Sequence, residues 1–398
     1  MTGDLALRLW REGYRALQEA RAGAGGGDVF AGRLLGRRAV VVRGHEGAKL
    51  FYDTTVVERR HAVPAALADL LFGRGAVHGL DGTTHRARKQ LFLDLLAEDQ
   101  IAGVADQVAA ELRARSERWR GREVVLFDEL TKAYAAAILD WVGAECSPAE
   151  AARLGHRMAA IVDGFGFAPV AYPRAWVERL RGNAWGRQLL RRARERPAGA
   201  TSPTGTLAEE LGPAAGAVEL LNIVRPTVAV AWPGTFAALA LAEHPQWRDL
   251  LRGERRDGVA ERRVAFGHEV RRYYPFVPAL AGRARRGVEI GGVPLRPGDR
   301  LVLDVVGTNH DPALWDEPEV FRPERFAGVQ PDPYDFVPQG GGDPRTGHRC
   351  PGEPLTVRLL AATLGVLAEV DYEVVSSGSY DGSRIPTRPA GGLVVAVR

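Results

Sequence analysis

Cysteine is scarce in this chain, which has only Cys146 and Cys350 among its 398 residues. Two cysteines cannot form a disulfide framework or a cysteine-rich zinc site. They leave room for one thiolate with a special role. Long apolar stretches are also missing: no run of eighteen apolar residues occurs, and we therefore expect no membrane span.

Lysine is nearly absent as well, since 3 of the 53 basic residues are lysines and the rest are arginines. The formal net charge is +4, but the 49 acidic residues are interspersed with the arginines. No basic run alternates with aromatic residues, so we expect a solvated, salt-bridged surface and no nucleic-acid partner. The alternative is that a few buried arginines bind an anionic small molecule or cofactor.

The first twenty residues carry acids and arginines within a helical pattern. They lack the basic start and the following apolar stretch that mark a secretory signal peptide. From this pattern we expect a cytoplasmic protein.

The apolar spacing predicts a mainly α protein with a small β portion. Apolar residues recur every three or four positions through most of residues 60–250, as in amphipathic helices. Short apolar or alternating runs predict strands in residues 30–52, which include RRAVVVRG and AKLFYD, and in residues 287–306 and 371–398. No internal repeat is visible, and we expect one domain over residues 1–398.

Two stretches interrupt the helical and strand patterns. Residues 196–206 are rich in Pro, Gly, Ser and Thr, which predicts a surface loop. Residues 307–352 are long, irregular and rich in Pro and Gly. A stretch of that length inside a compact domain needs a function or a ligand to order it.

The sequence FVPQGGGDPRTGHRCPGE (336–353) is the first candidate for chemistry. Cys350 follows a Gly-rich loop and precedes a predicted helix, in whose first turn Pro351 would fit. Backbone N–H donors and the positive end of the helix dipole stabilise a thiolate there, and His348 and Arg349 add positive charge. The alternative is a buried structural cysteine. Cys146 has no comparable surroundings and is expected to be inert.

Two further motifs precede this loop. Glu269 and Arg272 are three positions apart and share a helix face, which by itself is typical of a surface pair. The segment FRPERF (321–326) contributes Arg325, which could complete a charged cluster. The three motifs in this order resemble the cytochrome P-450 superfamily along essentially the whole chain. The resemblance implies that the cluster holds the segment that wraps the proximal side of the cofactor.

The resemblance also implies the cytochrome P-450 fold, with heme b held between a long distal helix and the proximal Cys loop. Cys350 would be the axial ligand of the heme iron, as a thiolate that tunes its reactivity. The loop from Phe336 to Cys350 is longer than is usual in the superfamily. In this it is similar to the bacterial fatty-acid peroxygenases and decarboxylases. That branch implies fatty acid and hydrogen peroxide as partners, with no redox partner required.

The helix expected across the distal face, residues 217–245, contains Arg225-Pro226 among apolar residues. An arginine there is costly without a partner, and Pro226 frees the carbonyl of Asn222. One alternative is that Arg225 extends to the surface; the other is that its fork binds a carboxylate. In the resembled branch this pair binds the fatty-acid carboxylate, which acts as general acid and base on peroxide. The activity implied is oxidation at the α or β carbon, with some decarboxylation.

Several residues are assigned by the same resemblance. Arg59, His85, Lys89 and His348 would hold the heme propionates. His78 would lie in the distal pocket near the first carbons of the substrate and could carry a proton near neutral pH, which would favour the alkene product. The apolar walls would be formed by Phe72, Phe167 and Phe276.

Pro233-Gly234 departs from the branch, and two helix breakers so close to Pro226 predict a kinked or loosened distal helix. Two other functions stay open. One is a redox-partner-dependent monooxygenase that acts on another carboxylate-bearing compound or a natural product. The other is a non-catalytic carrier of heme or fatty acid, which would bind its ligand without turnover.

Overall fold

The structure is a computed structural model, and it describes residues 3–166, 168–195, 202–254, 261–376 and 378–398. It is mainly helical with a small β portion, as predicted. The helices are α1 (Leu5–Glu12), α2 (Ala16–Gly23), α3 (Gly44–Tyr52), α4 (Ala65–Leu71), α5 (Gly82–Leu95), α6 (Glu98–Trp119), α7 (Leu126–Trp141), α8 (Pro148–Asp163), α9 (Ala171–Arg194), α10 (Pro203–Ala229), α11 (Ala231–Glu243), α12 (Pro245–Arg252), α13 (Glu261–Tyr273), α14 (Val305–Asn309) and α15 (Glu353–Glu369). The strands are β1 (Val29–Leu34), β2 (Arg37–Val42), β3 (Val57–Glu58), β4 (Arg122–Val125), β5 (Ala279–Ala284), β6 (Val288–Ile290), β7 (Val293–Leu295), β8 (Arg300–Asp304), β9 (Tyr372–Val374) and β10 (Val394–Val397).

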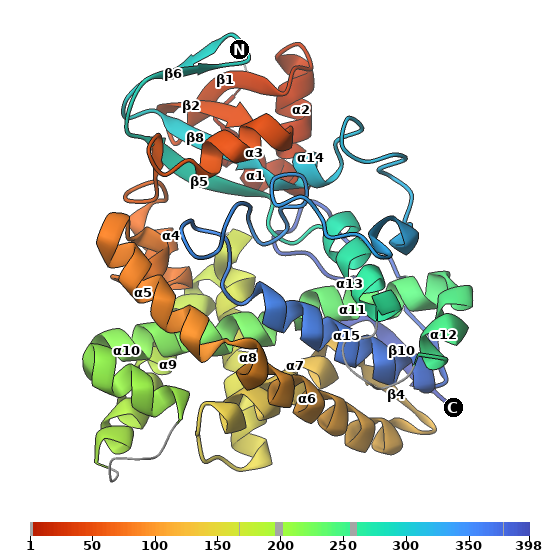
Figure 1. Cartoon of the computed structure of the whole chain (residues 1–398). Helices are drawn as coiled ribbons and strands as arrows, with labels where there is room; N and C mark the ends of the chain where they lie inside the picture. The colour runs from red at the N-terminus through yellow and green to blue at the C-terminus, as the bar shows by residue number, and fades with distance from the viewer. Residues whose placement is uncertain (1–2, 167, 196–201, 255–260, 377) are drawn as a thin grey trace.

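The main sheet has the strand order β1-β2-β8-β5-β3. The β1–β2 pair is an antiparallel hairpin, and β2 runs parallel to β8 with Val40 opposite Leu301. Figure 1 shows this sheet with α1, α2 and α3 at one end of the molecule and most of the helices at the other. The segment that leads to Cys350 runs between these two parts.

The run AKLFYD (48–53) was expected to be a strand, and that prediction is wrong. All but its last residue lie in α3. Ala48, Phe51 and Tyr52 are buried, and their three- and four-residue spacing gives α3 one apolar face against the sheet. The prediction of a loop over residues 196–206 is also wrong for its last part, because residues 203–206 are helical. Residues 196–201 lie outside the described residues, but α10 begins at Pro203, where the Ser202 hydroxyl accepts a hydrogen bond from the Gly205 N–H.

The stretch Pro203–Glu243, which covers α10 and α11, is long and apolar enough to cross a membrane by length and composition. Within it, 78% of the most apolar window is buried inside the protein. Its buried apolar residues from Leu220 to Leu241 belong to the largest apolar core cluster. The burial therefore favours a core helix.

The distal helix is interrupted in the turn between Pro226 and Pro233-Gly234, in the region where a loosened segment was predicted, but the break is small. The helix is interrupted only at Val230, which keeps right-handed helical angles, and α11 continues from Ala231. A Cβ atom on Gly234 would lie 2.9 Å from the Tyr134 hydroxyl, so the glycine lets α11 approach α7 closely. The strong kink in α10 lies elsewhere, at Gly212 with φ 71° and ψ 171°.

Candidate active site

Cys350 lies in the turn before α15. Its N–H donates to the Gln339 carbonyl (3.1 Å), and the Gln339 Nε2 lies 3.7 Å from the Sγ atom. The helix begins at Glu353, so Pro354, and not Pro351, occupies its first turn. Burial raises the pKa of the Cys350 thiol, and the Gly352 N–H and Lys89 counteract this only in part. The groups expected to stabilise a thiolate are present, but their effect on the pKa is smaller than that of burial. A metal ion bound to the sulfur would itself deprotonate the thiol.

Arg59, His85, Lys89 and His348 are brought together around the Cys loop. The rings of His85 and His348 stack at 3.9 Å, and Arg59 lies over the Phe51 ring at 3.9 Å. The Nη1 atom of Arg59 is buried and has no hydrogen-bond partner. Lys89 donates to the carbonyls of Gly347 (3.2 Å) and Arg349.

Asp81 is the carboxylate that faces this basic group. It lies 3.6 Å from His348 and accepts hydrogen bonds from the N–H groups of Arg59 and Arg60. Burial acts to raise the pKa of Asp81, but the His348 hydrogen bond and these N–H groups outweigh it and lower the pKa to about 2. Burial lowers the pKa of His85 to about 3 and that of Lys89 to about 8. The cluster therefore has more basic groups than this one carboxylate can pair.

Arg225 is 8% exposed, which excludes the alternative that its side chain extends to the surface. Its Nη2 lies 3.5 Å from the Asn222 Oδ1, and its Nε is buried without a partner. Among the described residues no carboxylate lies within 4.0 Å of it. Burial, followed by the nearby Arg179, lowers the pKa of Arg225 to about 9. The guanidinium therefore stays charged at neutral pH, and its Nε donor has no partner. The adjacent Pro226 has no backbone N–H.

His78 lies in a short 3-10 turn, Val77–Gly79, and its ring stacks on Phe72 at 4.0 Å. The residue as a whole is exposed, and the Phe72 ring covers one face of the imidazole. Neighbouring protein groups nevertheless desolvate the imidazole and lower its pKa, and positive charge from Arg225, Lys89, His348 and His85 lowers it further. This shift of the pKa works against the expected protonation of His78 near neutral pH in the free protein.

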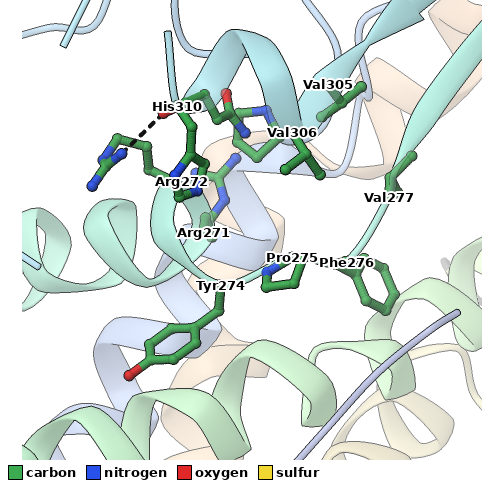
Figure 2. Close-up of a pocket in the computed structure, with 11 residues that line it drawn as sticks. Arg271, Arg272, Tyr274, Pro275, Phe276, Val277, Val305, Val306 and His310 are labelled. Atoms are coloured by element: carbon green, nitrogen blue, oxygen red, sulfur yellow. Dashed lines mark hydrogen bonds between the residues drawn. The ribbon is translucent and has the colours of Figure 1, made fainter. Parts of the chain in front are cut away.

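Phe276, the second predicted pocket wall, lies beside a small cavity (Figure 2). Its volume of about 20 Å³ has room for about one water molecule. The Tyr14 hydroxyl donates to the Phe276 carbonyl (2.7 Å) and fixes the backbone there. Phe167, the third predicted wall, lies outside the described residues. The cavity is lined by Arg271, Arg272, Tyr274, Pro275, Phe276, Val277, Val305, Val306, Asn309, His310 and Pro338.

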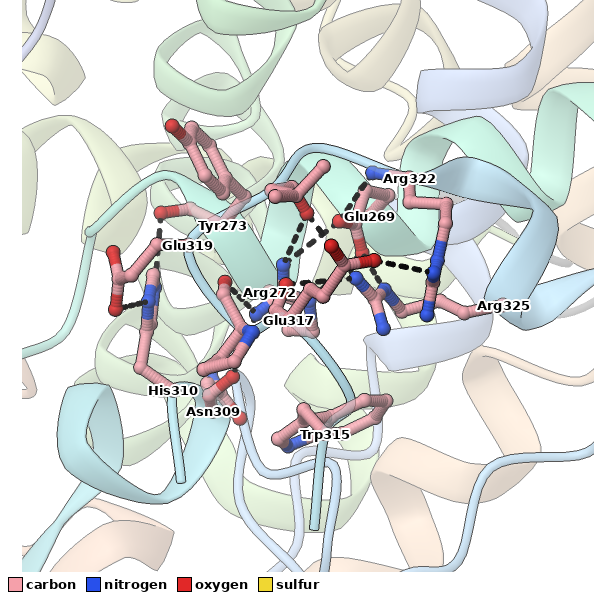
Figure 3. A network of polar contacts seen from close by, with 12 residues as sticks. Glu269, Arg272, Tyr273, Asn309, His310, Trp315, Glu317, Glu319, Arg322 and Arg325 are labelled. Carbon is pink, nitrogen blue, oxygen red and sulfur yellow. Dashed lines mark hydrogen bonds and ion pairs between the residues drawn. The ribbon is translucent and has the colours of Figure 1, made fainter. Parts of the chain in front are cut away.

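Glu269, Arg272 and Arg325 meet in one buried network (Figure 3). Arg272 donates to both carboxylate oxygens of Glu269 at 2.8 Å, and Arg325 lies 3.2 Å from Glu269. Arg272 also donates to the carbonyls of Asn309 and Pro318, both at 2.9 Å. The network therefore ties α13 to the irregular segment that precedes the Cys loop.

Replacing Glu269 by alanine should destabilise the protein by about 3–5 kcal/mol, because it leaves the buried Arg272 charge uncompensated. The measurement is the free energy of unfolding in urea. Asp316→Ala is the matched control, since it removes an exposed ion pair with Arg322 (2.9 Å) in the same network. That change should cost at most about 1 kcal/mol. Equal losses in the two variants would contradict a supporting role for the buried pair.

Sequence reasoning missed a second buried network, which lies beside Arg225. Glu219 is fully buried in α10 and accepts from Arg88 (2.7 Å) and from the Asn222 side chain (3.0 Å). Arg179, from α9, is 1% exposed and donates to the carbonyls of residues 71 and 72. The signal for Glu219 was present in the sequence: it is a carboxylate in an apolar stretch, six positions before Arg225.

Comparison with known proteins identifies the family to which this fold belongs. The family model for cytochrome P-450 matches residues 264–366. Cytochrome P-450SP alpha (CYP152B1), solved with (R)-ibuprofen, superposes with a TM-score of 0.92, with 35% identity over 99% of each chain. Ligand-free cytochrome P-450 OleT superposes with a TM-score of 0.93, with 33% identity over 99% of this chain and 97% of that one. Among curated proteins, cytochrome P-450 137 of Mycobacterium tuberculosis is 34% identical over 127 residues, which are 32% of this chain and 26% of the relative.

The fold and the residues around Cys350 therefore define a heme-dependent oxidoreductase of the cytochrome P-450 class. Within that class the chain belongs to the CYP152 family, the peroxygenase and decarboxylase family that includes P-450SP alpha and OleT.

The residues around Cys350 fit a heme. A heme carries two propionates, and the cluster around Asp81 offers more basic groups than that carboxylate can pair. The Nη1 atom of Arg59 is a buried donor without a partner, which is costly unless a ligand accepts from it. The sulfur of Cys350 supplies the donor type of a heme-thiolate protein.

Proposed function

We propose that this protein uses hydrogen peroxide to hydroxylate fatty acids at the α or β carbon, with decarboxylation as a second outcome. The observation that carries the proposal is the buried, charged Arg225, with an unused Nε donor and no described carboxylate within 4.0 Å. A carboxylate ligand would pair this charge with two parallel hydrogen bonds. Family membership then makes a fatty acid the natural candidate.

The roles of the remaining residues follow from their positions. Cys350 would ligate the iron, and Arg59, His85, Lys89 and His348 would hold the propionates. When bound, the heme supplies the oxidising chemistry. The chain itself binds the substrate acid on Arg225, beside Pro226, and shapes the apolar space with Phe72 and Phe276.

The substrate carboxylate held on Arg225 would act as general acid and base on the peroxide, in place of a protein side chain. This mechanism needs no reductase, so no redox partner is required. A cytoplasmic location is part of the same proposal.

Two relatives support a carboxylic acid as the substrate. Cytochrome P-450SP alpha has been solved with (R)-ibuprofen, and a variant of cytochrome P-450 OleT has been solved with arachidonic acid. Both ligands are carboxylic acids with a large apolar body. The apolar surroundings of Arg225 in α10 suit the same combination.

Product analysis tests the proposal directly. The holoenzyme is incubated with a chain-length series of fatty acids and hydrogen peroxide, without a reductase, and with the matching methyl esters as controls. We expect α- or β-hydroxy acids and terminal alkenes from the acids and little product from the esters. If esters react as fast as acids, the carboxylate-dependent mechanism is wrong. If turnover needs a reductase, the enzyme is a redox-partner-dependent monooxygenase.

His78→Gln should lower the ratio of alkene to hydroxy acid by about three- to tenfold without abolishing turnover, which requires only about 1 kcal/mol between the two outcomes. The reason is that the imidazole can supply a proton beside the first carbons of the substrate, which favours the alkene, whereas the glutamine amide cannot. Its protonated fraction rises as the pH falls toward its lowered pKa, so the alkene share of the parent should rise toward acidic pH, whereas that of His78→Gln should not.

The matched control for His78 is His156→Gln, which changes a histidine of α8 that bonds to the Ala152 carbonyl (2.9 Å). Its product ratio should equal that of the parent protein. If His78→Gln also leaves the ratio of alkene to hydroxy acid unchanged, His78 only lines the pocket and does not influence the product.

A further inference from the structure

Glu219 joins three parts of the chain through its two carboxylate oxygens. Its Oε1 accepts from the Arg88 Nη1 of α5 (2.7 Å) and from the Val77 N–H (2.9 Å). Its Oε2 accepts from the Asn222 Nδ2 one turn along α10 (3.0 Å). All three partners are donors, and the carboxylate is fully buried. Such a group is tolerated only because its lone pairs are satisfied.

The Asn222 amide is oriented by these contacts. Its Nδ2 donates to Glu219 and also to the Phe72 carbonyl (2.9 Å), so both of its N–H donors point at acceptors. The Oδ1 atom is thereby turned toward the Nη2 of Arg225, 3.5 Å away. Glu219 therefore determines that Arg225 faces an oxygen and not a second set of donors.

The loop that carries Phe72 and His78 is held at two points. At its start, Arg179 donates to the Phe72 carbonyl (3.2 Å), which Asn222 also contacts. At its end, the N–H of Val77, the residue before His78, donates to Glu219. The same carboxylate therefore contacts the helix that carries Arg225 and the loop that carries His78.

We propose that Glu219 is a positioning residue that fixes Arg225 and His78 relative to each other, and thereby sets which carbon of the bound acid is oxidised. It acts through Asn222 on Arg225 and through the Val77 N–H on His78. This inference rests on the proposed function, since the relative position of Arg225 and His78 matters only if Arg225 holds the carboxylate end of the substrate. A small movement of either side chain relative to the other shifts the carbon chain along the pocket.

The decisive variant is Glu219→Gln, which keeps the shape of the side chain but leaves one acceptor oxygen for the three donors of Arg88, Val77 and Asn222. If that oxygen stays on Arg88 and Val77, its new NH₂ group opposes the Asn222 NH₂ group. The Asn222 amide then turns over and presents donors to Arg225, which weakens the site for a carboxylate.

We expect the KM for the fatty acid to rise about tenfold while kcat changes less than about threefold. The ratio of α to β products should shift at least about threefold. The dissociation constant of the acid from the holoenzyme, measured by calorimetry, should rise in parallel. Hydrogen exchange of residues 72–80 should accelerate, because the Val77 anchor is weakened.

Glu129→Gln is the matched control. Glu129, in α7, accepts from the Trp119 indole (3.1 Å) and from Lys132 (2.6 Å), and it has no contact with this network. That variant should keep the KM and the product ratio of the parent. If Glu219→Gln does not fold, Asn222→Ala tests the inference in its place. That variant leaves the Arg88–Glu219 pair intact and should reproduce the rise in KM.

A folded Glu219→Gln with parental KM, dissociation constant and product ratio would overturn the inference. So would a control variant that changes them equally, or an unchanged KM in Asn222→Ala. The proposed function is judged separately, by turnover of the parent with peroxide and its loss in Arg225→Ala. If that turnover is absent, the function itself fails, whatever Glu219→Gln does.

Discussion

Arg225→Ala should remove most of the fatty-acid turnover with peroxide while the protein keeps its fold and its heme. A charge-assisted bidentate pair in a desolvated pocket is worth about 2–5 kcal/mol when one partner is removed. This corresponds to a fall in kcat/KM of about 30-fold to about 4,000-fold. The fold should survive because the guanidinium makes only weak contacts with the described residues: its Nη2 lies 3.5 Å from the Asn222 Oδ1, and its Cζ lies 5.8 Å from the centre of the Phe72 ring.

Arg225→Lys separates charge from geometry. Lysine keeps the positive charge but loses the planar fork, so it cannot bind a carboxylate with two parallel bonds. We expect a kcat/KM between those of the parent and Arg225→Ala, measured with one fatty acid at saturating peroxide. A parental kcat/KM in Arg225→Ala would show that the carboxylate binds elsewhere.

Cys350→Ala should remove the red-shifted Soret band that the reduced protein shows under carbon monoxide when a thiolate ligates the heme. The physical reason is that the band reports the electron density that a thiolate donates to iron. Alanine offers no ligand atom. The loss should be complete, and the measurement needs no substrate.

Cys146→Ala is the control for Cys350→Ala. Burial and the nearby Glu150 and Asp140 raise the pKa of the Cys146 thiol, and it lies far along the chain from the Cys loop. Its removal should leave the band unchanged. A normal band in Cys350→Ala would contradict the assignment of the ligand and, with it, the proposed mechanism.

Local patterns in the sequence were sufficient for the fold class and for the motifs. The three- and four-residue apolar spacing predicts the helices because each helix has to bury one face. The Glu269–Arg272 spacing depends on only one helical turn. The distinctive loop before Cys350 and the Arg225-Pro226 pair likewise lie within short segments, so their family resemblance was visible without a structure.

Short apolar runs were less informative, and AKLFYD shows why. A run of that length fits a strand as well as one face of a helix, and only its packing against the sheet settles the choice. Gly234 is a similar case. Its helix-breaking tendency is a local property, whereas its contact with Tyr134 depends on how closely α11 and α7 approach.

The environment of the candidate site was decided by tertiary structure alone. Glu219 meets the Val77 N–H from 142 positions away and Arg88 from 131 positions away. The lowered pKa of His78 likewise comes from desolvation by neighbouring protein groups and from four basic side chains that the fold gathers around it. Hydrogen-bond partners and desolvation depend on which distant segments pack together, and no local sequence pattern contains that information.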